Sequence, residues 1–237
     1  MDDGDKALLV AATGFEVRPT LDHFGCNSPH LEGLGRPGAT FECNLFDCLV
    51  TGVGQLQCSA HLANHLAAKR YKYVIQAGVA GSFSSSFPKC SVVRVTEELL
   101  GDFGAESGDT FLDIAQMNLL PNEGSPFRGG VLKVSEPYCA RVLGLPGVRS
   151  VTVNRTLANP SSIEWIRDRF KPDIVNMEGA ALFYVCSLKS VPFIELRAIS
   201  DMVGPRDKSA WDIPGAVQAL NSHIITLLET GFELNPA

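Results

Sequence analysis

Short apolar segments of β-strand length recur along the chain. They consist mainly of Val, Ile, Leu and Ala and run almost without interruption by polar residues. Continuous runs of this kind are typical of strands covered on both faces, as in parallel sheets. The predicted strands span residues 7–12, 45–51, 73–77, 91–96, 130–134, 148–153 and 191–199.

Helical spacing of apolar residues lies between several of these strands. In residues 55–69, Leu56, Ala60, Ala63 and Ala67 fall on one stripe. Further helices are predicted over residues 161–170, 181–188 and 213–228. The alternation of strands and helices predicts an α/β fold with a mainly parallel sheet.

Residues 101–130 fit neither pattern. They are rich in Gly, Asp, Glu and Pro, which predicts a long excursion over the surface. No repeat, low-complexity segment or shift of composition marks a domain boundary. Residues 1–237 are therefore expected to form a single domain.

Composition and charge narrow the possible partners. The 237 residues are 45% hydrophobic and 19% charged, which is ordinary for a globular protein. A net charge of −6 and a pI near 5.4, with scattered Lys and Arg, argue against a nucleic-acid or anionic membrane surface. No apolar run approaches the roughly 20 residues of a membrane span.

Cysteine usage suggests a reducing compartment. The seven cysteines are odd in number and form no CxxC pair, which favours reduced thiols over a disulfide framework or a zinc site. The acidic start, Met1-Asp2-Asp3-Gly4-Asp5, is unlike a secretory signal. A cytoplasmic protein is expected.

Three acidic residues are the candidates for a catalytic role. Glu178 and Asp201 lie 23 residues apart, each at the end of a predicted element, and Glu16 follows the first predicted strand at a helix N-terminus. The carboxyl ends of strands are where α/β sheets place ligands. Acids gathered there would repel one another and have raised pKa values, which suits acid/base work, unless one or two are merely exposed helix caps.

Other kinds of site are disfavoured. Gly52-Val53-Gly54 and Gly78-Val79-Ala80-Gly81 follow predicted strands and would allow close backbone approach to a ligand, but no GxGxxG or GxxxxGK[ST] motif is present. A GxSxG elbow is also absent. His61 and His65 are four apart on a helix without a third ligand, so no metal and no cofactor are expected.

Five sequence blocks together resemble the nucleoside phosphorylase/nucleosidase superfamily, and within it the futalosine hydrolases and the 5′-methylthioadenosine/S-adenosylhomocysteine nucleosidases. The blocks are Ala11–Glu16, Thr51–Gly54, Ala77–Gly81, Met177–Ala181 and Arg197–Asp201. The last two, at their spacing, are the most specific. The resemblance covers nearly the whole chain and implies a three-layer fold, with a mixed, mainly parallel central sheet flanked by helices.

The resemblance also implies roles for individual residues in N-glycosidic cleavage. Asp201 is similar to the acid that protonates purine N7, and Glu178 to the residue that holds the ribose hydroxyls, with Met177 packed against the ribose. Glu16 would hold and deprotonate the attacking water. Arg197 would neutralise and orient the acids, and Gly78 and Val79 would belong to the substrate-binding loop.

Water is favoured over phosphate as the nucleophile. Phosphorylases of the superfamily supply an arginine just before the Gly78-type loop, where this chain has Gln76. Glu16 would add negative charge at the place where phosphate has to bind. Hydrolysis is therefore expected.

The substrate is narrowed by two further blocks, Gly101–Glu106 and Val203–Trp211, which look like futalosine hydrolase. That enzyme cleaves a nucleoside with a carboxyphenyl ketone at C5′, on a menaquinone route. Methylthioadenosine nucleosidases usually have Ser at the position of Val79. Arg206 would pair with the substrate carboxylate, or else with Asp207 or Asp212 in its own loop.

One residue departs from the futalosine hydrolase pattern. Those enzymes often have Asn at the position of Asp201, and an Asp accepts a hydrogen bond from a 6-amino group. Aminodeoxyfutalosine is therefore a second candidate substrate.

Three alternatives remain open: a methylthioadenosine nucleosidase, a phosphorylase and a non-catalytic nucleoside-binding protein. The superfamily forms symmetric oligomers, so at least a homodimer is expected.

Overall fold

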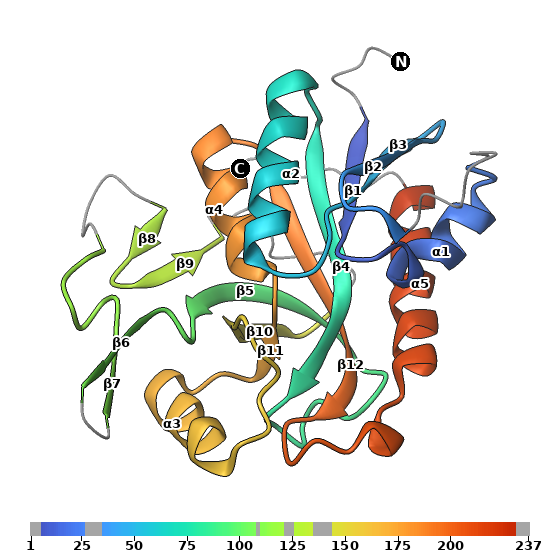
Figure 1. Cartoon of the computed structure of the whole chain (residues 1–237). Helices are drawn as coiled ribbons and strands as arrows, with labels where there is room; N and C mark the ends of the chain where they lie inside the picture. Colours follow the sequence, from blue (N-terminus) through green and yellow to red (C-terminus); the bar gives the residue numbers. More distant parts are fainter. Residues whose placement is uncertain (1–5, 27–34, 108–109, 121–125, 135–143, 231–237) are drawn as a thin grey trace.

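The structure is a computed structural model. It describes residues 6–26, 35–107, 110–120, 126–134 and 144–230 (Figure 1). The N-terminal residues 1–5 and Cys139, which entered the predictions above, lie outside the described residues.

The main sheet contains ten strands. Nine of them follow in the order β2 (Ala39–Glu42), β3 (Phe46–Val50), β1 (Ala7–Ala11), β4 (Tyr73–Ser82), β11 (Ile174–Asn176), β10 (Gly147–Thr152), β5 (Val92–Leu100), β9 (Val131–Lys133) and β8 (Phe127–Arg128). The tenth, β12 (Phe193–Met202), pairs with β4 in parallel and with β5 antiparallel. Strands β4, β11, β10, β5 and β12 therefore close a ring of neighbours.

This closure changes the predicted architecture. The α/β class and the mixed sheet are confirmed, but the described strands form five parallel and five antiparallel pairs in the main sheet, so it is not mainly parallel. An open sheet between two helix layers does not describe the ring either. The long strands β4 and β12 belong both to the open part of the sheet and to the ring.

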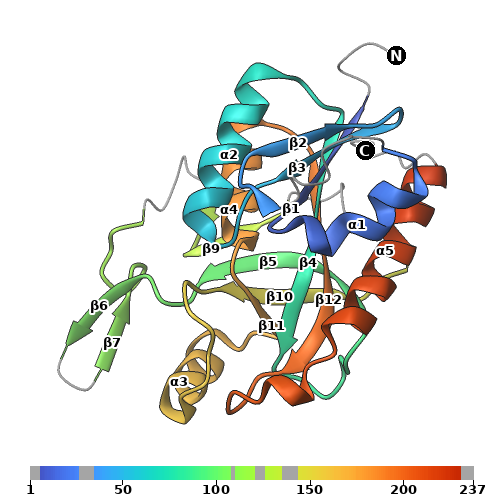
Figure 2. The same cartoon turned by 45° about the vertical axis from the view of Figure 1, so that its right-hand side comes forward.

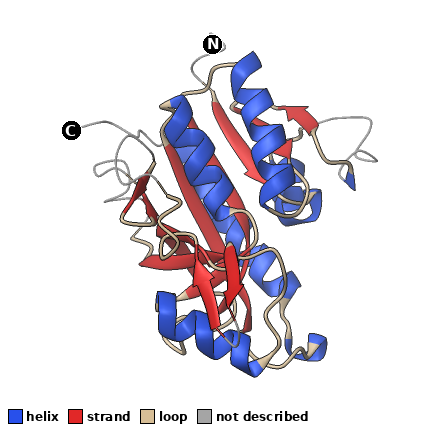
Figure 3. Ribbon diagram, turned by 60° about the vertical axis from the view of Figure 1, so that its left-hand side comes forward, coloured by secondary structure: helices blue, strands red, loops and turns tan. Residues whose placement is uncertain are grey.

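Helices cover both faces of the sheet around β1, β4 and β12. Helices α1 (Gly14–His23) and α5 (Ile213–Thr230) pack together on one face, and α2 (Gln55–Ala68) and α4 (Gly179–Lys189) on the other (Figures 1 and 2). Helix α3 (Pro160–Phe170) lies beside the ring, and Figure 3 shows the strands between the blue helices.

The two helix layers explain the continuous apolar runs. In β1, Leu9 belongs to the core cluster beneath α1 and α5, whereas Leu8 and Val10 belong to the cluster beneath α2 and α4. Because successive side chains of a strand point to opposite faces, a strand buried on both faces is apolar at nearly every position unless a buried polar side chain has partners.

The residues predicted as a surface excursion contain a hairpin of their own. Strands β6 (Gly104–Ser107) and β7 (Thr110–Asp113) pair antiparallel and form a separate two-stranded sheet. Strand β8 joins the main sheet beyond them.

Two predictions about local structure are wrong. The block Gly78-Val79-Ala80-Gly81 lies inside β4 rather than after a strand, because β4 continues to Ser82. Cys26 and Cys43 form a disulfide instead of remaining thiols. Of the other described cysteines, Cys48, Cys58 and Cys186 are buried thiols and Cys90 is partly exposed.

In the described part of the chain, no helix is long and apolar enough to cross a membrane.

Candidate active site

A cavity of about 330 Å³ lies where β1 and β11 end and where β4 and β12 pass side by side. Five of the predicted site residues line it: Glu16, Val79, Met177, Glu178 and Asp201. The sequence places them on four separate segments, and the sheet brings them together. Much of the remaining wall is apolar, which is typical of a small-molecule site.

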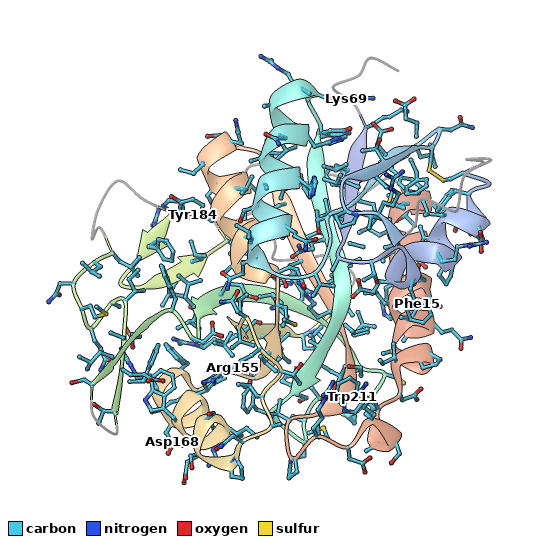
Figure 4. The ribbon with its side chains drawn as sticks, in the orientation of Figure 1. Phe15, Lys69, Arg155, Asp168, Tyr184 and Trp211 are labelled. Atoms are coloured by element: carbon cyan, nitrogen blue, oxygen red, sulfur yellow. A yellow bond between two sulfur atoms is a disulfide. The ribbon has the colours of Figure 1, made fainter. Side chains whose placement is uncertain are left out.

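Two aromatic side chains line the same cavity. Phe15 comes from the first turn of α1 and Trp211 from the segment before α5, and both are labelled in Figure 4. Phe15 is 56% exposed, so much of its ring has no protein cover among the described residues.

Glu16 is held firmly at the N-terminus of α1. Its Oε2 accepts hydrogen bonds from Thr13 N (2.9 Å) and Thr13 Oγ1 (3.0 Å), and its Oε1 accepts one from Val79 N (3.1 Å). On the far side, Asn221 of α5 donates to the backbone oxygen of Glu16 (2.8 Å). Burial, and then the like charge of Glu178, raise the pKa of Glu16, against the lowering effect of Arg197.

Glu178 caps α4 and reaches across to α2. Its Oε1 accepts a hydrogen bond from Gly54 N (2.9 Å), at the N-cap position of α2, and its Oε2 lies 3.3 Å from Arg197 Nη1. The side chain is 6% exposed and lines the cavity. A fixed carboxylate therefore stands in the wall of the site.

Arg197 lies behind the cavity wall, fully buried, as the common partner of several polar groups. Its Nε donates to Glu195 Oε1 (2.7 Å), its Nη1 to Glu178, and its Nη2 to Gln76 Oε1 (3.2 Å). Burial lowers the pKa of the Arg197 guanidinium, but the neighbouring acids, Glu195 first, together outweigh burial and raise it. Arg197 therefore links Glu178, Glu195 and Gln76 behind the cavity wall, and its role in the reaction stays a prediction.

Gly78 lies against Arg197 in the pairing of β4 with β12. A Cβ at this position would collide with the Arg197 guanidinium and press on Glu16 Oε1. Glycine is therefore needed here for clearance, not for a turn.

Asp201 lines the cavity from the β-bulge where β12 shifts register against β4. Its Oδ1 accepts a hydrogen bond from Ser200 Oγ (2.7 Å). Partial burial raises its pKa, while Ser200 acts in the lowering direction. The group is thus closer to protonation near neutral pH than an ordinary Asp.

Arg206 does not line the cavity and is exposed. The two acids of its loop have other partners: Asp207 accepts hydrogen bonds from Ser209, and Asp212 from Gly215 N. Within the described ranges, Arg206 forms no ion pair with either acid, so its role in carboxylate binding stays a prediction.

Sequence reasoning missed several polar residues behind the site. Glu98 and Glu195 are completely buried, and Asn176 and Thr152 connect Glu98 to the start of α4. The available signal was an acid inside an apolar strand, as at Glu195 in residues 191–199. Buried acids of this kind require partners.

The histidine pair has a structural contact. His65 Nε2 lies 2.6 Å from the Tyr71 hydroxyl oxygen, which itself donates to Asp47 (2.8 Å). Among the residues described, no group of three or more His, Cys, Asp or Glu side chains is placed to hold a metal ion.

Comparison with known proteins shows the family to which this chain belongs. Residues 6–230 match the family model of the phosphorylase superfamily. The futalosine hydrolase of Streptomyces coelicolor is 31% identical over 226 residues, covering 91% of this chain and 93% of that protein. The 5′-methylthioadenosine/S-adenosylhomocysteine nucleosidase of Bacillus subtilis is 28% identical over 170 residues, covering 69% and 71%.

Solved structures share the fold. The futalosine hydrolase of Helicobacter pylori has a TM-score of 0.77 at 18% identity, covering 96% of this chain and 98% of that one. The 5′-methylthioadenosine/S-adenosylhomocysteine nucleosidase of Neisseria meningitidis has a TM-score of 0.72 at 16% identity, covering 96% and 99%.

Proposed function

The chain belongs to the phosphorylase superfamily, and from that membership we propose that it is a futalosine hydrolase-type enzyme. It uses water to cleave the N-glycosidic bond of a 5′-modified purine nucleoside and releases the purine base. The observation that carries the proposal is the convergence of Glu16, Glu178 and Asp201 on one largely apolar cavity. The reaction belongs to menaquinone biosynthesis.

Glu178 stabilises the sugar. Cleavage of the glycosidic bond leaves positive charge on the ribose, and a fixed carboxylate in the wall lowers the energy of that charge more than the energy of the neutral substrate. Its position is fixed in advance by Gly54 N and Arg197, so little reorganisation is needed. Met177, the preceding residue, packs against the ribose.

Asp201 assists departure of the base. The raised pKa of its carboxyl allows it to donate a proton to N7, which makes the purine a better leaving group. Ser200 holds Oδ1 and leaves Oδ2, beside Gly81 in the cavity wall, for the base.

Glu16 prepares the nucleophile. A carboxylate has about four acceptor positions, and three hydrogen bonds from Thr13 and Val79 leave one for a water molecule. The raised pKa makes Glu16 a stronger base than an exposed glutamate.

The charges of the site favour water over phosphate. The nearest cation, Arg197, is already engaged by Glu178 and Glu195, and Gln76 lies at the position where phosphorylases have an arginine. A phosphate dianion near Glu16 and Glu178 would meet two carboxylates, and no Lys or Arg is among the described residues that line the cavity.

Two features support a large 5′ group. Val79 stands where methylthioadenosine nucleosidases usually have Ser, and the rings of Phe15 and Trp211 offer an apolar surface for a carboxyphenyl group. Arg206, exposed in the loop before Trp211, is the proposed partner of the carboxylate.

Asp201 also affects which purine base the site prefers. Because a carboxylate accepts from a 6-amino group, whereas a 6-oxo purine prefers a donor, aminodeoxyfutalosine is a second candidate substrate. Comparable cleavage of futalosine and aminodeoxyfutalosine would contradict this preference.

We further propose a homodimer that buries the outer face of α2 and α4. Leu56, Tyr184 and Leu188 are exposed there, by 84%, 40% and 58%. A groove of about 580 Å³ runs between the two helices and Phe103. Exposed apolar surface of this extent marks an interaction site.

A cytoplasmic location for the protein stays a prediction.

The decisive experiment measures purine release without phosphate from futalosine, aminodeoxyfutalosine and methylthioadenosine in parallel. Release from either carboxyphenyl nucleoside but not from methylthioadenosine supports the proposal. Cleavage of methylthioadenosine alone makes the protein a methylthioadenosine nucleosidase, and activity only after addition of phosphate makes it a phosphorylase. Affinity without turnover in all cases makes it a nucleoside-binding protein.

A further inference from the structure

Two acids that do not line the cavity lie immediately behind it. Glu98 on β5 and Glu195 on β12 have an exposed fraction of 0%. Burying a carboxyl group is costly unless its oxygens are hydrogen-bonded. The partners of Glu98 show what its carboxyl group does.

Glu98 accepts one hydrogen bond at each oxygen. Thr152 Oγ1 donates to Oε2 at 2.7 Å, and Asn176 Nδ2 donates to Oε1 at 2.5 Å. Thr152 is the last residue of β10 and Asn176 the last of β11, so Glu98 connects the ends of two strands beside its own.

The other ends of these two side chains hold the first turn of α4. Thr152 Oγ1 accepts a hydrogen bond from Ala180 N (2.9 Å). Asn176 Oδ1 accepts from Glu178 N (2.8 Å) and from Gly179 N (2.6 Å). The first backbone N–H groups of a helix have no partner within the helix, and here two side chains supply it.

Glu98 fixes the orientation of both side chains. Thr152 presents a lone pair to the helix only if its own proton has an acceptor on the other side. Asn176 directs its oxygen to the helix only if its NH₂ group also finds acceptors. Glu98 provides the near acceptor for Thr152 and one of the two for Asn176, the other being Ser150 Oγ at 2.7 Å. An apolar residue at position 98 would remove both contributions.

We propose that Glu98 is a positioning residue for Glu178, acting through Thr152 and Asn176 on the residue that caps α4. Glu178 extends from this held backbone to Gly54 N and Arg197, so a shift of the first turn of α4 moves the carboxylate that faces the ribose. The inference rests on the proposed function.

Glu195 completes the arrangement from β12. Its Oε1 lies 3.4 Å from Asn176 Nδ2 and 2.7 Å from Arg197 Nε. The groups around Glu98 are thus Ser150 and Thr152 on β10, Asn176 on β11, Glu195 and Arg197 on β12, and the backbone of Gly179 on α4. A Cβ at position 179 would collide with both glutamates, so only glycine lets the helix start this close to them.

The test compares Glu98→Leu with Glu98→Gln and with the neighbouring surface change Glu97→Gln. Glu97 pairs with Lys133 and Arg149 and is 24% exposed, so it serves as the matched control on the same strand. Two quantities are measured for each variant: kcat/KM for purine release and the inhibition constant of the free purine base.

We expect Glu98→Leu to lower kcat/KM about 10- to 100-fold, since it removes the support of one or two hydrogen bonds. Glu98→Gln should restore most of the activity, because its amide oxygen can accept from Asn176 Nδ2 while its NH₂ group donates to the Thr152 hydroxyl, which can accept as well as donate. Affinity for the free base should not change in either variant, since the proposed contact of the base is Asp201, which is hydrogen-bonded to Ser200 on β12. Glu97→Gln should behave as the unaltered protein.

Other results would overturn the inference. Full kcat/KM in Glu98→Leu, or an equal loss of base affinity, would show no specific link to the ribose side. If Glu98→Leu does not fold, Thr152→Val breaks one connection while keeping Glu98, and it should lower kcat/KM with base affinity retained. Unchanged kcat/KM in that variant would then overturn the inference.

If the unaltered protein releases no purine, the proposed function fails, and crystal structures then decide the inference separately. Displacement of Glu178 Oε1 from Gly54 N in Glu98→Leu or Thr152→Val supports it. Retention of that contact at its present 2.9 Å contradicts it.

Discussion

Glu16 combines two demands that conflict in an ordinary helix. As the third residue of α1 it is hydrogen-bonded to the start of its own helix at Thr13, a contact that lowers the pKa of a carboxyl. In its proposed role as a base it must keep a high proton affinity. Burial beside Glu178 supplies the raising effect, and it outweighs the two backbone hydrogen bonds and Arg197.

The change Glu16→Gln separates these two roles. Gln keeps the size and one acceptor of Glu16 but cannot take a proton from water. We expect kcat to fall about 100- to 10,000-fold, the usual contribution of a general base, while KM changes little. Steady-state kinetics measure both, with Glu164→Gln on the exposed face of α3 as the control. An unchanged kcat would remove Glu16 from the catalytic step.

Glu98 gives the protein a pH-dependent stability. Burial, and then Glu195, raise the pKa of its carboxyl from 4.5 to about 8. Between these values the folded protein holds a proton that the unfolded chain releases, so the contribution of Glu98 to the free energy of unfolding falls as pH rises. The slope for one proton is at most about 1.4 kcal/mol per pH unit.

Denaturant unfolding at pH 6 and pH 8 tests this effect. The stability of Glu98→Gln relative to the unaltered protein should be greater at pH 8 than at pH 6, because the variant has no proton to lose at this position. A difference in stability that is the same at both pH values would contradict the assigned direction. Glu97→Gln, on the neighbouring partly exposed position, is the control.

Among the elements, β4 and β12 position much of the site, because they pair in parallel along most of their length. This pairing stacks Gly78 against Arg197 and brings Gly81 next to Asp201. The same glycine block that resembles a ligand-binding loop is therefore also a point of strand contact.

The change Gly78→Ala tests that contact. Its Cβ would collide with the Arg197 guanidinium, which has no free side to move to among Glu178, Glu195 and Gln76. We expect a loss of about 1–3 kcal/mol in the free energy of unfolding, as for overpacked interiors, together with reduced kcat/KM. In Gly204→Ala, where the nearest atom to a new Cβ is 3.9 Å away, stability should stay within about 0.5 kcal/mol. Equal stability of both variants would contradict the clearance argument.

The elements that sequence patterns identified are those whose signal is local. Strand β1 and helix α2 were predicted almost to the residue, since their apolar positions follow the period of one element. Strands β2 and β11, of four and three residues, are too short to show a period. Glu98 and Glu195 were missed because their partners, Thr152, Asn176 and Arg197, lie on other elements. The three acids lining the cavity were found because each lies close to the end of a predicted element and because the sequence blocks around them resemble the superfamily.

At the scale of the molecule, the exposed apolar face and the cavity are neighbours. Helix α2 begins directly after Gly54, whose N–H holds Glu178, and α4 begins directly after Glu178 itself. The groove between these helices is lined by Gln55 and Ala180, which lie in the first turns of α2 and α4. Any partner bound to this face would contact the first turns that position the Glu178 carboxylate, the proposed contact of the ribose.

The change Leu56→Glu tests both the proposed homodimer and this link. It places a charge at the most exposed large apolar side chain of the face, and burying an unpaired charge in an interface is costly. Light scattering should show about half the mass of the unaltered protein, and kcat/KM should fall because the first turn of α2 loses its cover. Leu45→Glu, at a 43% exposed position between β2 and β3 that does not line the groove, should leave both mass and kcat/KM unchanged. A monomeric mass for the unaltered protein would contradict the proposed homodimer. A dimer that survives Leu56→Glu would place the interface elsewhere, and a monomeric variant with full kcat/KM would show that the site needs no second subunit.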